Sequence, residues 1–234
     1  MNKIIFDNKA VQGYVDAHLE VLEYQPHIVQ YNKVRQLHQS VINDMCKLLE
    51  DSEYINNKLD KLDEYVSSEV QGSLVLDIKF GDADDRSIFA ELFVYKNHDK
   101  LKSITEEFIE KNKYRSIEKK KMLDAMNRSY VSLFKVVDAD EYLGVVVYED
   151  VFTKERYEII DKYMSILVVD PKQQKIYIYN RIINYDGIYF GTGIHCQCKE
   201  NKKILNYIKN HKYKDCSNYV RCLELYNICR TNRN

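Results

Sequence analysis

Side chains that can bind a metal ion are concentrated near the end of the chain. Five of the six cysteines lie at or after position 196, and two histidines stand among them. Zinc in structural sites is held by four Cys or His ligands in a tetrahedral arrangement. The sequence therefore predicts one zinc candidate, with ligands drawn from His195, Cys196, Cys198, His211 and Cys216.

The irregular spacing of these ligands also allows a plainer interpretation. No second cysteine pair follows Cys196 and Cys198 at the short distance typical of a zinc knuckle. Cys222 and Cys229 stand on one helical face with Leu225, where a free cysteine acts as a small apolar residue. Buried thiols without metal are the favoured prediction.

The same segment is basic. Residues 199–234 hold nine Lys or Arg and three acidic residues, which gives this segment a net charge of +6. The whole chain has a net charge of −1, so the preceding residues carry −7. Basic residues with tyrosines between them can follow a phosphate backbone and stack on bases. A solvated helical face is the plainer interpretation. The nucleic-acid-binding candidates are Lys202, Lys203, Lys209, Lys212, Lys214 and Arg221.

A metal-dependent nuclease is a further alternative. Asp77-Ile78-Lys79, with Glu64 or Glu69 upstream, loosely matches an acidic pattern that holds a divalent cation and activates water. Such a triplet arises often by chance in a chain with 30% charged residues. No motif of a serine hydrolase, zinc protease or deaminase occurs, so we predict no catalytic residue.

Glycine is too scarce for the common nucleotide-binding loops. The chain has seven Gly and two Pro, and the glycines never form GxGxxG or GxxxxGK[ST]. These counts exclude nucleotide binding through either motif.

Helices are expected from residue 1 to about 128. Apolar residues recur at three- and four-residue steps on both sides of Pro26, which should interrupt the helical pattern. Asp51-Ser52 could cap a third helix, and further helices are expected near 88–95, 104–109 and 117–126. Residues 73–80 fit a short strand or the start of a helix.

The apolar period changes from about four to two at Tyr130, which indicates strands. Short turn-like connections separate the expected strands, and Met164–Val169 is one of them. Several short strands in so few residues predict a small antiparallel β-barrel or curled sheet over 129–193. A C-terminal helical cap is expected over 194–234, so the fold class is α+β.

Residues 88–193 contain the blocks IFAELFVYKN, SLFKVVDAD, YEDVFTKERYEIIDKYMS and YNRIINYDGIYFGTG. This order resembles the companion region of bacterial proteins that carry the SEC-C zinc motif. The most specific matches are the turn formed by Asp150 and Thr153 and the block from Arg181 to Gly187. A tryptophan of the family's helical block is Leu92 here, and the zinc motif itself is not matched. The resemblance implies the helical and barrel architecture, and no activity.

The remaining composition points to a cytoplasmic binding protein. Near-neutral charge excludes a wholly basic nucleic-acid binder, and no apolar run approaches the ~20 residues of a membrane helix. The start of the chain has no apolar signal segment, so export is not expected. We predict a non-enzymatic binding or adaptor module with an unknown protein partner or a homodimer seam. The alternatives are a nucleic-acid-associated protein and, after it, a metal-dependent enzyme.

Overall fold

The computed structural model confirms the α+β class. It describes residues 9–49, 53–54, 57, 91, 93–95, 102–111, 116–168, 170–192, 196–210 and 224–229. The strand expected over 73–80 and most of the helix expected after Asp51 lie outside these ranges.

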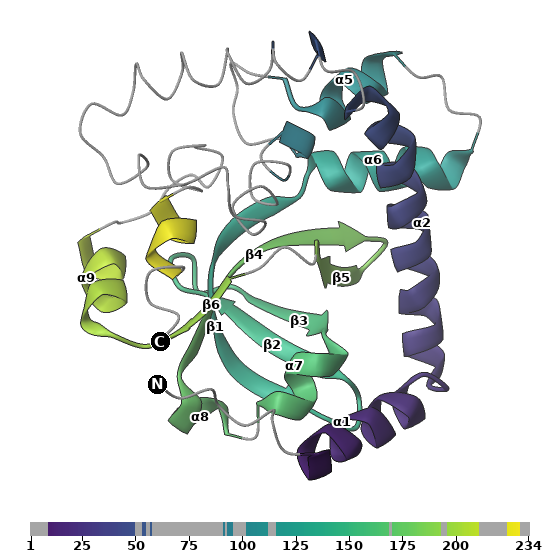
Figure 1. Cartoon of the computed structure of the whole chain (residues 1–234). Coiled ribbons are helices and arrows are strands. Elements are labelled where there is room, and N and C mark those ends of the chain that lie inside the picture. The colour runs from purple at the N-terminus through teal and green to yellow at the C-terminus, as the bar shows by residue number, and fades with distance from the viewer. Residues whose placement is uncertain are drawn as a thin grey trace.

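Two N-terminal helices meet at the predicted interruption. α1 spans Lys9–Leu22 and α2 spans Pro26–Leu49. Pro26 occupies the first position of α2, where its missing N–H costs nothing. Figure 1 shows α2 as a long helix along one side of the barrel, with α1 at its lower end. No helix in the described ranges is long and apolar enough to cross a lipid bilayer.

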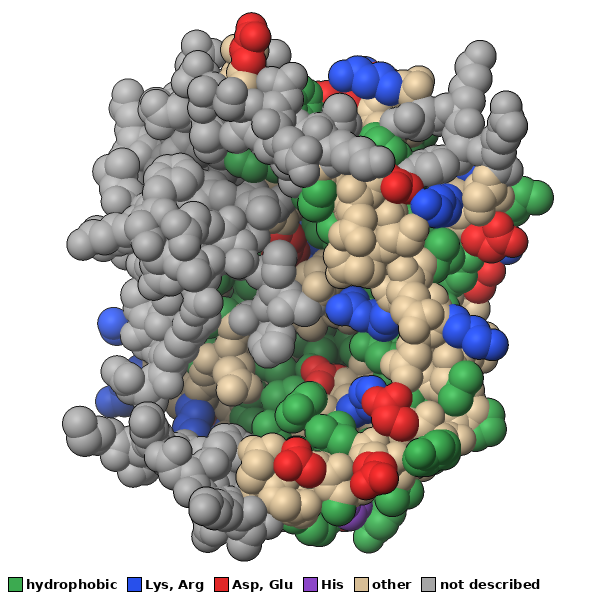
Figure 2. Space-filling view, turned by 45° about the vertical axis from the view of Figure 1, so that its right-hand side comes forward, with side chains coloured by type: hydrophobic (Ala, Val, Ile, Leu, Met, Phe, Trp, Pro, Cys, Tyr) green, Lys and Arg blue, Asp and Glu red, His purple; other side chains and the backbone are tan. Residues whose placement is uncertain are grey.

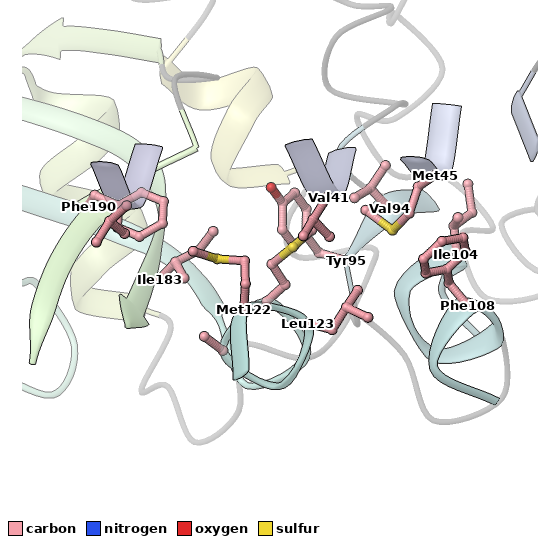
Figure 3. Close-up of a cluster of buried hydrophobic side chains, with 13 residues drawn as sticks. Val41, Met45, Val94, Tyr95, Ile104, Phe108, Met122, Leu123, Ile183 and Phe190 are labelled. Carbon is pink, nitrogen blue, oxygen red and sulfur yellow. The ribbon is translucent and has the colours of Figure 1, made fainter. Parts of the chain in front are cut away.

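Two further helices lie at the upper end of α2, opposite α1 (Figure 1). α5 spans Ile104–Lys111 and α6 spans Ile117–Asn127, close to their predicted positions. Ser116 caps α6, because its Oγ accepts a hydrogen bond from the Lys119 N–H. Figure 3 shows apolar side chains of α2, α5 and α6 converging with Ile183 and Phe190 of the sheet. This core attaches the helices to the barrel.

Six strands form one sheet, and five of them close into a barrel. The order is β1-β2-β3-β5-β4-β6, and an additional β1–β4 pairing closes the ring. The strands are β1 (Tyr130–Asp140), β2 (Val145–Asp150), β3 (Arg156–Ile160), β4 (Ile176–Tyr185), β5 (Ile188–Gly191) and β6 (Cys196–Lys199).

The barrel differs from the prediction in two ways. β3 and β5 pair in parallel, so the barrel is mixed rather than wholly antiparallel. The segment expected as a strand at Met164–Val169 is instead helix α7, Lys162–Leu167. Asp161 caps this helix, and its Oδ1 accepts a hydrogen bond from the Met164 N–H at 3.0 Å. The cap decides between helix and strand for a short apolar run that suits both.

The two faces of the barrel sheet belong to different cores. Inward residues such as Phe134, Tyr148, Ile178 and Ile182 fill the barrel interior. Outward residues of β1, β4 and β6 pack against the C-terminal helices. α8 (Pro171–Gln174) lies between α7 and β4, and α9 spans Lys202–Asn210.

The C-terminal segment is helical as expected, but it also adds a strand. α9 and residues 224–229 are helical, whereas β6 pairs with β4 from Ile176 to Tyr179. The sheet therefore extends beyond residue 193, into the segment expected to form only the helical cap.

Candidate functional site

The two cysteines of the predicted zinc set that the structure describes lie in an apolar core. Cys196 and Cys198 are buried on the outward face of β6, together with Cys229 of the helical residues 224–229. A hydrogen bond with the Cys198 side chain and burial raise the pKa of the Cys229 thiol well above its ordinary value. Cys229 and Leu225 share this buried face, as expected of a thiol acting as an apolar residue.

The rest of that ligand set cannot be placed beside them. His195, His211 and Cys216 lie outside the described residues. Within the described ranges, no three His, Cys, Asp or Glu side chains form a group that could hold a metal ion. The zinc site stays a prediction.

Half of the predicted nucleic-acid set lies on α9. Lys202, Lys203 and Lys209 are exposed there, while Ile204 anchors the helix in the core. Tyr207 is half-buried, and its hydroxyl donates to Glu224 Oε2 at 3.1 Å. Lys212, Lys214 and Arg221 lie outside the described residues.

A buried ion pair joins the helical region to the barrel. Arg181 of β4 is 0% exposed and Glu91 is 1% exposed, and Arg181 Nε donates to Glu91 Oε1 at 2.7 Å. Arg181 Nη1 also lies 3.3 Å from Ser129 Oγ. Burial raises the pKa of Glu91, and the Arg181 charge opposes that shift. The pair connects β4 to Glu91, ninety residues earlier in the chain.

Aromatic and imidazole groups surround this pair. The Tyr95 ring centroid lies 4.8 Å from Arg181 Cζ, and the Tyr95 hydroxyl lies 2.9 Å from His38 Nε2. Burial lowers the pKa of His38 to about 4, with a further contribution from the Arg35 charge. We name Arg181, Glu91, Tyr95 and His38 the core network. Its buried groups contact one another, which suits a role in positioning the helices on the barrel.

A different arrangement lies on the surface, where α1 meets the turn between β1 and β2. Apolar side chains are exposed on both segments: Tyr142 is 69% exposed and Val21 is 67% exposed. His18 bridges them, with its ring 4.5 Å from the Tyr14 ring and 5.8 Å from the Tyr142 ring. We name this surface the hairpin patch. Its apolar members are Tyr14, Val21, Tyr24, Tyr142 and Leu143.

Hydrogen bonds hold the two halves of the hairpin patch together. The Tyr14 hydroxyl donates to Glu141 Oε2 at 2.9 Å, and Gln25 Nε2 donates to the Tyr142 carbonyl oxygen at 2.5 Å. His27 Nε2 lies 2.7 Å from the Leu143 carbonyl oxygen. The turn therefore has a fixed position relative to α1 and the start of α2.

The turn itself is also fixed. Asp140 Oδ1 accepts hydrogen bonds from the Tyr142 and Leu143 N–H groups, each at 2.9 Å. Gly144 follows with a φ of +67°, and a Cβ there would lie 3.3 Å from Leu22 Cδ1. Glycine at this position allows both the left-handed backbone and the close approach to α1.

The charge around the hairpin patch is predominantly negative, and Lys162 is paired with Glu23 at its edge. Residues 11–25 and 136–146 together contain six acidic residues and no Lys or Arg. Figure 2 shows Asp and Glu side chains between hydrophobic ones on the lower part of the face. The hydrogen bond to Glu141 raises the pKa of the Tyr14 hydroxyl. The acidic residues are Asp16, Glu20, Glu23, Asp138, Asp140 and Glu141.

Sequence reasoning missed this surface. The stripe of Val15, Leu19 and Leu22 identifies the core face of α1, but Tyr14 and Val21 form a second apolar stripe on an adjacent face. A second apolar stripe with acidic neighbours is a signal that the sequence contains. The turn that completes the patch comes from more than a hundred residues further along, and only the fold brings it there.

The core network and the whole barrel lie within the range matched by a sequence family. A model of a family of unknown function, DUF7986, matches residues 25–232, which leaves all of α1 outside the matched range. No curated protein and no solved structure matches the chain. The match carries no link to SEC-C proteins, so that resemblance stays a prediction. Because the matched residues cover most of its length, the chain belongs to this family of unknown function, DUF7986.

Proposed function

We propose that the chain is a non-enzymatic binding or adaptor module, and that its hairpin patch holds a basic segment of a partner protein. The observation that carries the proposal is the exposed tyrosine pair, Tyr14 and Tyr142, among six acidic residues, of which only Glu23 is paired with a lysine, Lys162, among the described contacts. Apolar surface rimmed by polar residues is typical of interaction sites. The predominantly negative charge favours a partner of the opposite sign.

Arginine is the side chain that fits this surface best. Its guanidinium can lie over a tyrosine ring and donate hydrogen bonds to carboxylates at the same time. Glu141 lies beside Tyr14, so a ring face and a carboxylate are available together. An arginine with an apolar neighbour would satisfy both components of the patch.

The fixed geometry of the patch favours binding. The turn is held by Asp140, and the contacts of Gln25 and His27 attach it to the helices. A surface that is ordered before binding loses less conformational entropy on association. Most of the conformational entropy of these side chains is therefore already lost when the chain folds, before the partner binds.

Fluorescence anisotropy with labelled peptides tests the proposal. A peptide of alternating Arg and Leu should bind, and one of alternating Glu and Leu should not. Tyr142→Ser and Glu20→Lys should each weaken binding about tenfold, as central interface residues do. Ile117, 68% exposed on α6, supplies the matched control Ile117→Ser. Equal binding of both peptides, or equal loss in the control, would refute the proposal.

A nucleic-acid-associated role is the second candidate, supported by the exposed Lys202, Lys203 and Lys209 of α9. It predicts binding of a labelled single-stranded RNA that weakens steeply with salt. Reversing the three lysine charges should abolish that binding. Binding that is absent or independent of salt would remove this candidate.

A metal-dependent enzyme is the third candidate. It rests on a ligand set that combines His195, His211 and Cys216 with the described cysteines, or on Asp77. Elemental analysis of the untagged protein tests it. Stoichiometric zinc that is lost in Cys198→Ala would support the cysteine set. A metal-free protein would rule it out. A cytoplasmic location accompanies the main proposal and is supported by the free thiols of the four described cysteines.

A further inference from the structure

The exposed face of α9 has the chemistry that the hairpin patch requires. Lys202, Leu205 and Lys209 are exposed at spacings of three and four residues, so they form one stripe along the helix. Leu205 is 45% exposed, although Ile204 beside it is fully buried in the core. The stripe therefore presents an apolar side chain with a cation on either side.

The charge of α9 is opposite to that of the patch. The helix carries Lys202, Lys203 and Lys209 and no acidic residue. Lys202 and Lys209 stand about 10 Å apart along the axis, at ~1.5 Å per residue. Glu141 lies beside Tyr14, which stands about 9 Å from Glu20 along α1 on the same scale. Two lysines can thus each face a carboxylate of the patch while Leu205 lies between them.

We propose that α9 of one copy of this chain docks on the hairpin patch of a second copy. This inference rests on the proposed function and names the basic segment that the patch holds. Leu205 would contact the apolar side chains of Tyr142 and Val21. Lys202 and Lys209 would pair with carboxylates of the rim, such as Glu20 and Glu141.

The contact must form between molecules. Figure 1 shows α9 on one side of the barrel and α1 on another, so neither element reaches the other within one chain. The contact joins two different surfaces, and each copy therefore keeps one free α9 and one free patch. Such a heterologous contact closes into a ring or continues as a chain of copies.

An apolar side chain at the centre of the stripe favours a protein over a nucleic acid as the occupant of α9. A phosphate backbone offers Leu205 no apolar contact, whereas Tyr142 does. Tyr207, which could stack on a base, is half-buried and donates its hydroxyl to Glu224. Binding of RNA by α9 in place of a second copy is an outcome that the experiment below detects.

Sedimentation velocity of the full chain, from micromolar to hundreds of micromolar, tests the inference. The wild-type protein should self-associate as concentration rises and dissociate as salt rises, because the rim charges are exposed. Asp16→Lys with Glu20→Lys should weaken self-association at least about tenfold. Lys202→Glu with Lys209→Glu should do the same.

A mixture of the two charge-reversal variants, one changed in the patch and one in α9, gives the most informative sedimentation experiment. The first variant keeps an unchanged α9 and the second keeps an unchanged hairpin patch, so the mixture should associate again through that contact. Glu118→Lys with Asp124→Lys on the exposed face of α6 is the matched control and should change nothing. Thermal unfolding of each variant verifies that it is folded.

Three results would overturn the inference. A wild-type chain that stays monomeric but binds the Arg–Leu peptide would refute self-docking and leave the proposed function standing. A monomeric chain that binds no peptide would refute both. A monomeric chain whose α9 lysines bind single-stranded RNA would assign α9 to nucleic acid.

Discussion

The core network and the hairpin patch place the same kinds of side chain in opposite environments. In the core network, charged groups are buried: Arg181 and Glu91 are almost inaccessible, and Tyr95 covers the guanidinium. In the hairpin patch, apolar rings are exposed, and Tyr142 and Tyr14 stand in solvent. Both arrangements cost free energy relative to the usual distribution of residues.

The difference shows what each arrangement accomplishes. Buried charges require partners of defined geometry, so the core network fixes how the helices sit on the barrel. Exposed rings bury little apolar area in the fold, and an exposed apolar patch is typical of interaction sites. We therefore expect changes in the core network to alter stability and changes in the hairpin patch to alter binding.

The largest effect is expected from Arg181→Met. The variant leaves Glu91 buried without its cation, which typically costs about 3–5 kcal/mol. Urea denaturation should show this loss in the free energy of unfolding. The double variant Arg181→Met with Glu91→Leu should recover part of it, because no uncompensated charge remains. A single variant as stable as wild type would show that the pair does not position the helices.

A pH dependence of stability is expected from His38. Its pKa is lowered to about 4 by burial, against 6.5 in the unfolded chain, so the unfolded state binds more protons between these values. The free energy of unfolding should therefore fall as pH decreases from 6.5 to 4, by at most about 3 kcal/mol. Denaturation at several pH values measures the slope. His38→Gln should reduce it, and an unchanged slope would contradict the assignment.

A smaller loss of stability is expected from Gly144→Ala. Its φ of +67° is unfavourable for a residue with a Cβ, at a cost of roughly 1–2 kcal/mol. The contact of Gly144 with Leu22 couples the turn to α1, so peptide binding to the patch should also weaken. Gly187→Ala, which has a φ of +88° but open space around it, is the control: similar strain, with no effect on binding.

The smallest stability effect is expected from Tyr142→Ser. The side chain is mostly exposed, so the free energy of unfolding should change by less than about 0.5 kcal/mol. The same variant should weaken binding of the Arg–Leu peptide about tenfold. Thermal unfolding and anisotropy on one preparation compare the two effects. A large loss of stability with unchanged binding would place Tyr142 in the fold rather than in a binding site.

Much of the architecture was predictable because local patterns determine it. The break at Pro26, the cap at Ser116 and the change of period at Tyr130 each act within a few residues. The strand predicted at Met164–Val169 is wrong, because its apolar content suits both states and the cap from Asp161 lies just before it. The parallel pairing of β3 with β5 could not be predicted, because no local sequence pattern indicates which strands pair or in which direction.

The candidate sites were predictable only in part. The lysines of α9 are exposed as their helical spacing indicates, and the buried state of Cys229 followed from its place beside Leu225. The core network could not be inferred, because Glu91 and Arg181 are ninety residues apart and nothing in either segment identifies the other.

The sequence by itself determined the α+β class, the helical ends, the small barrel and the basic character of the C-terminal segment. These properties depend on composition, period and caps, which act over one or two turns of chain. Only the tertiary structure decided that Tyr14 meets Glu141 and that Arg181 meets Glu91. Such contacts depend on how the barrel closes and how α1 and α2 pack against it, and no local pattern of residues encodes those long-range positions.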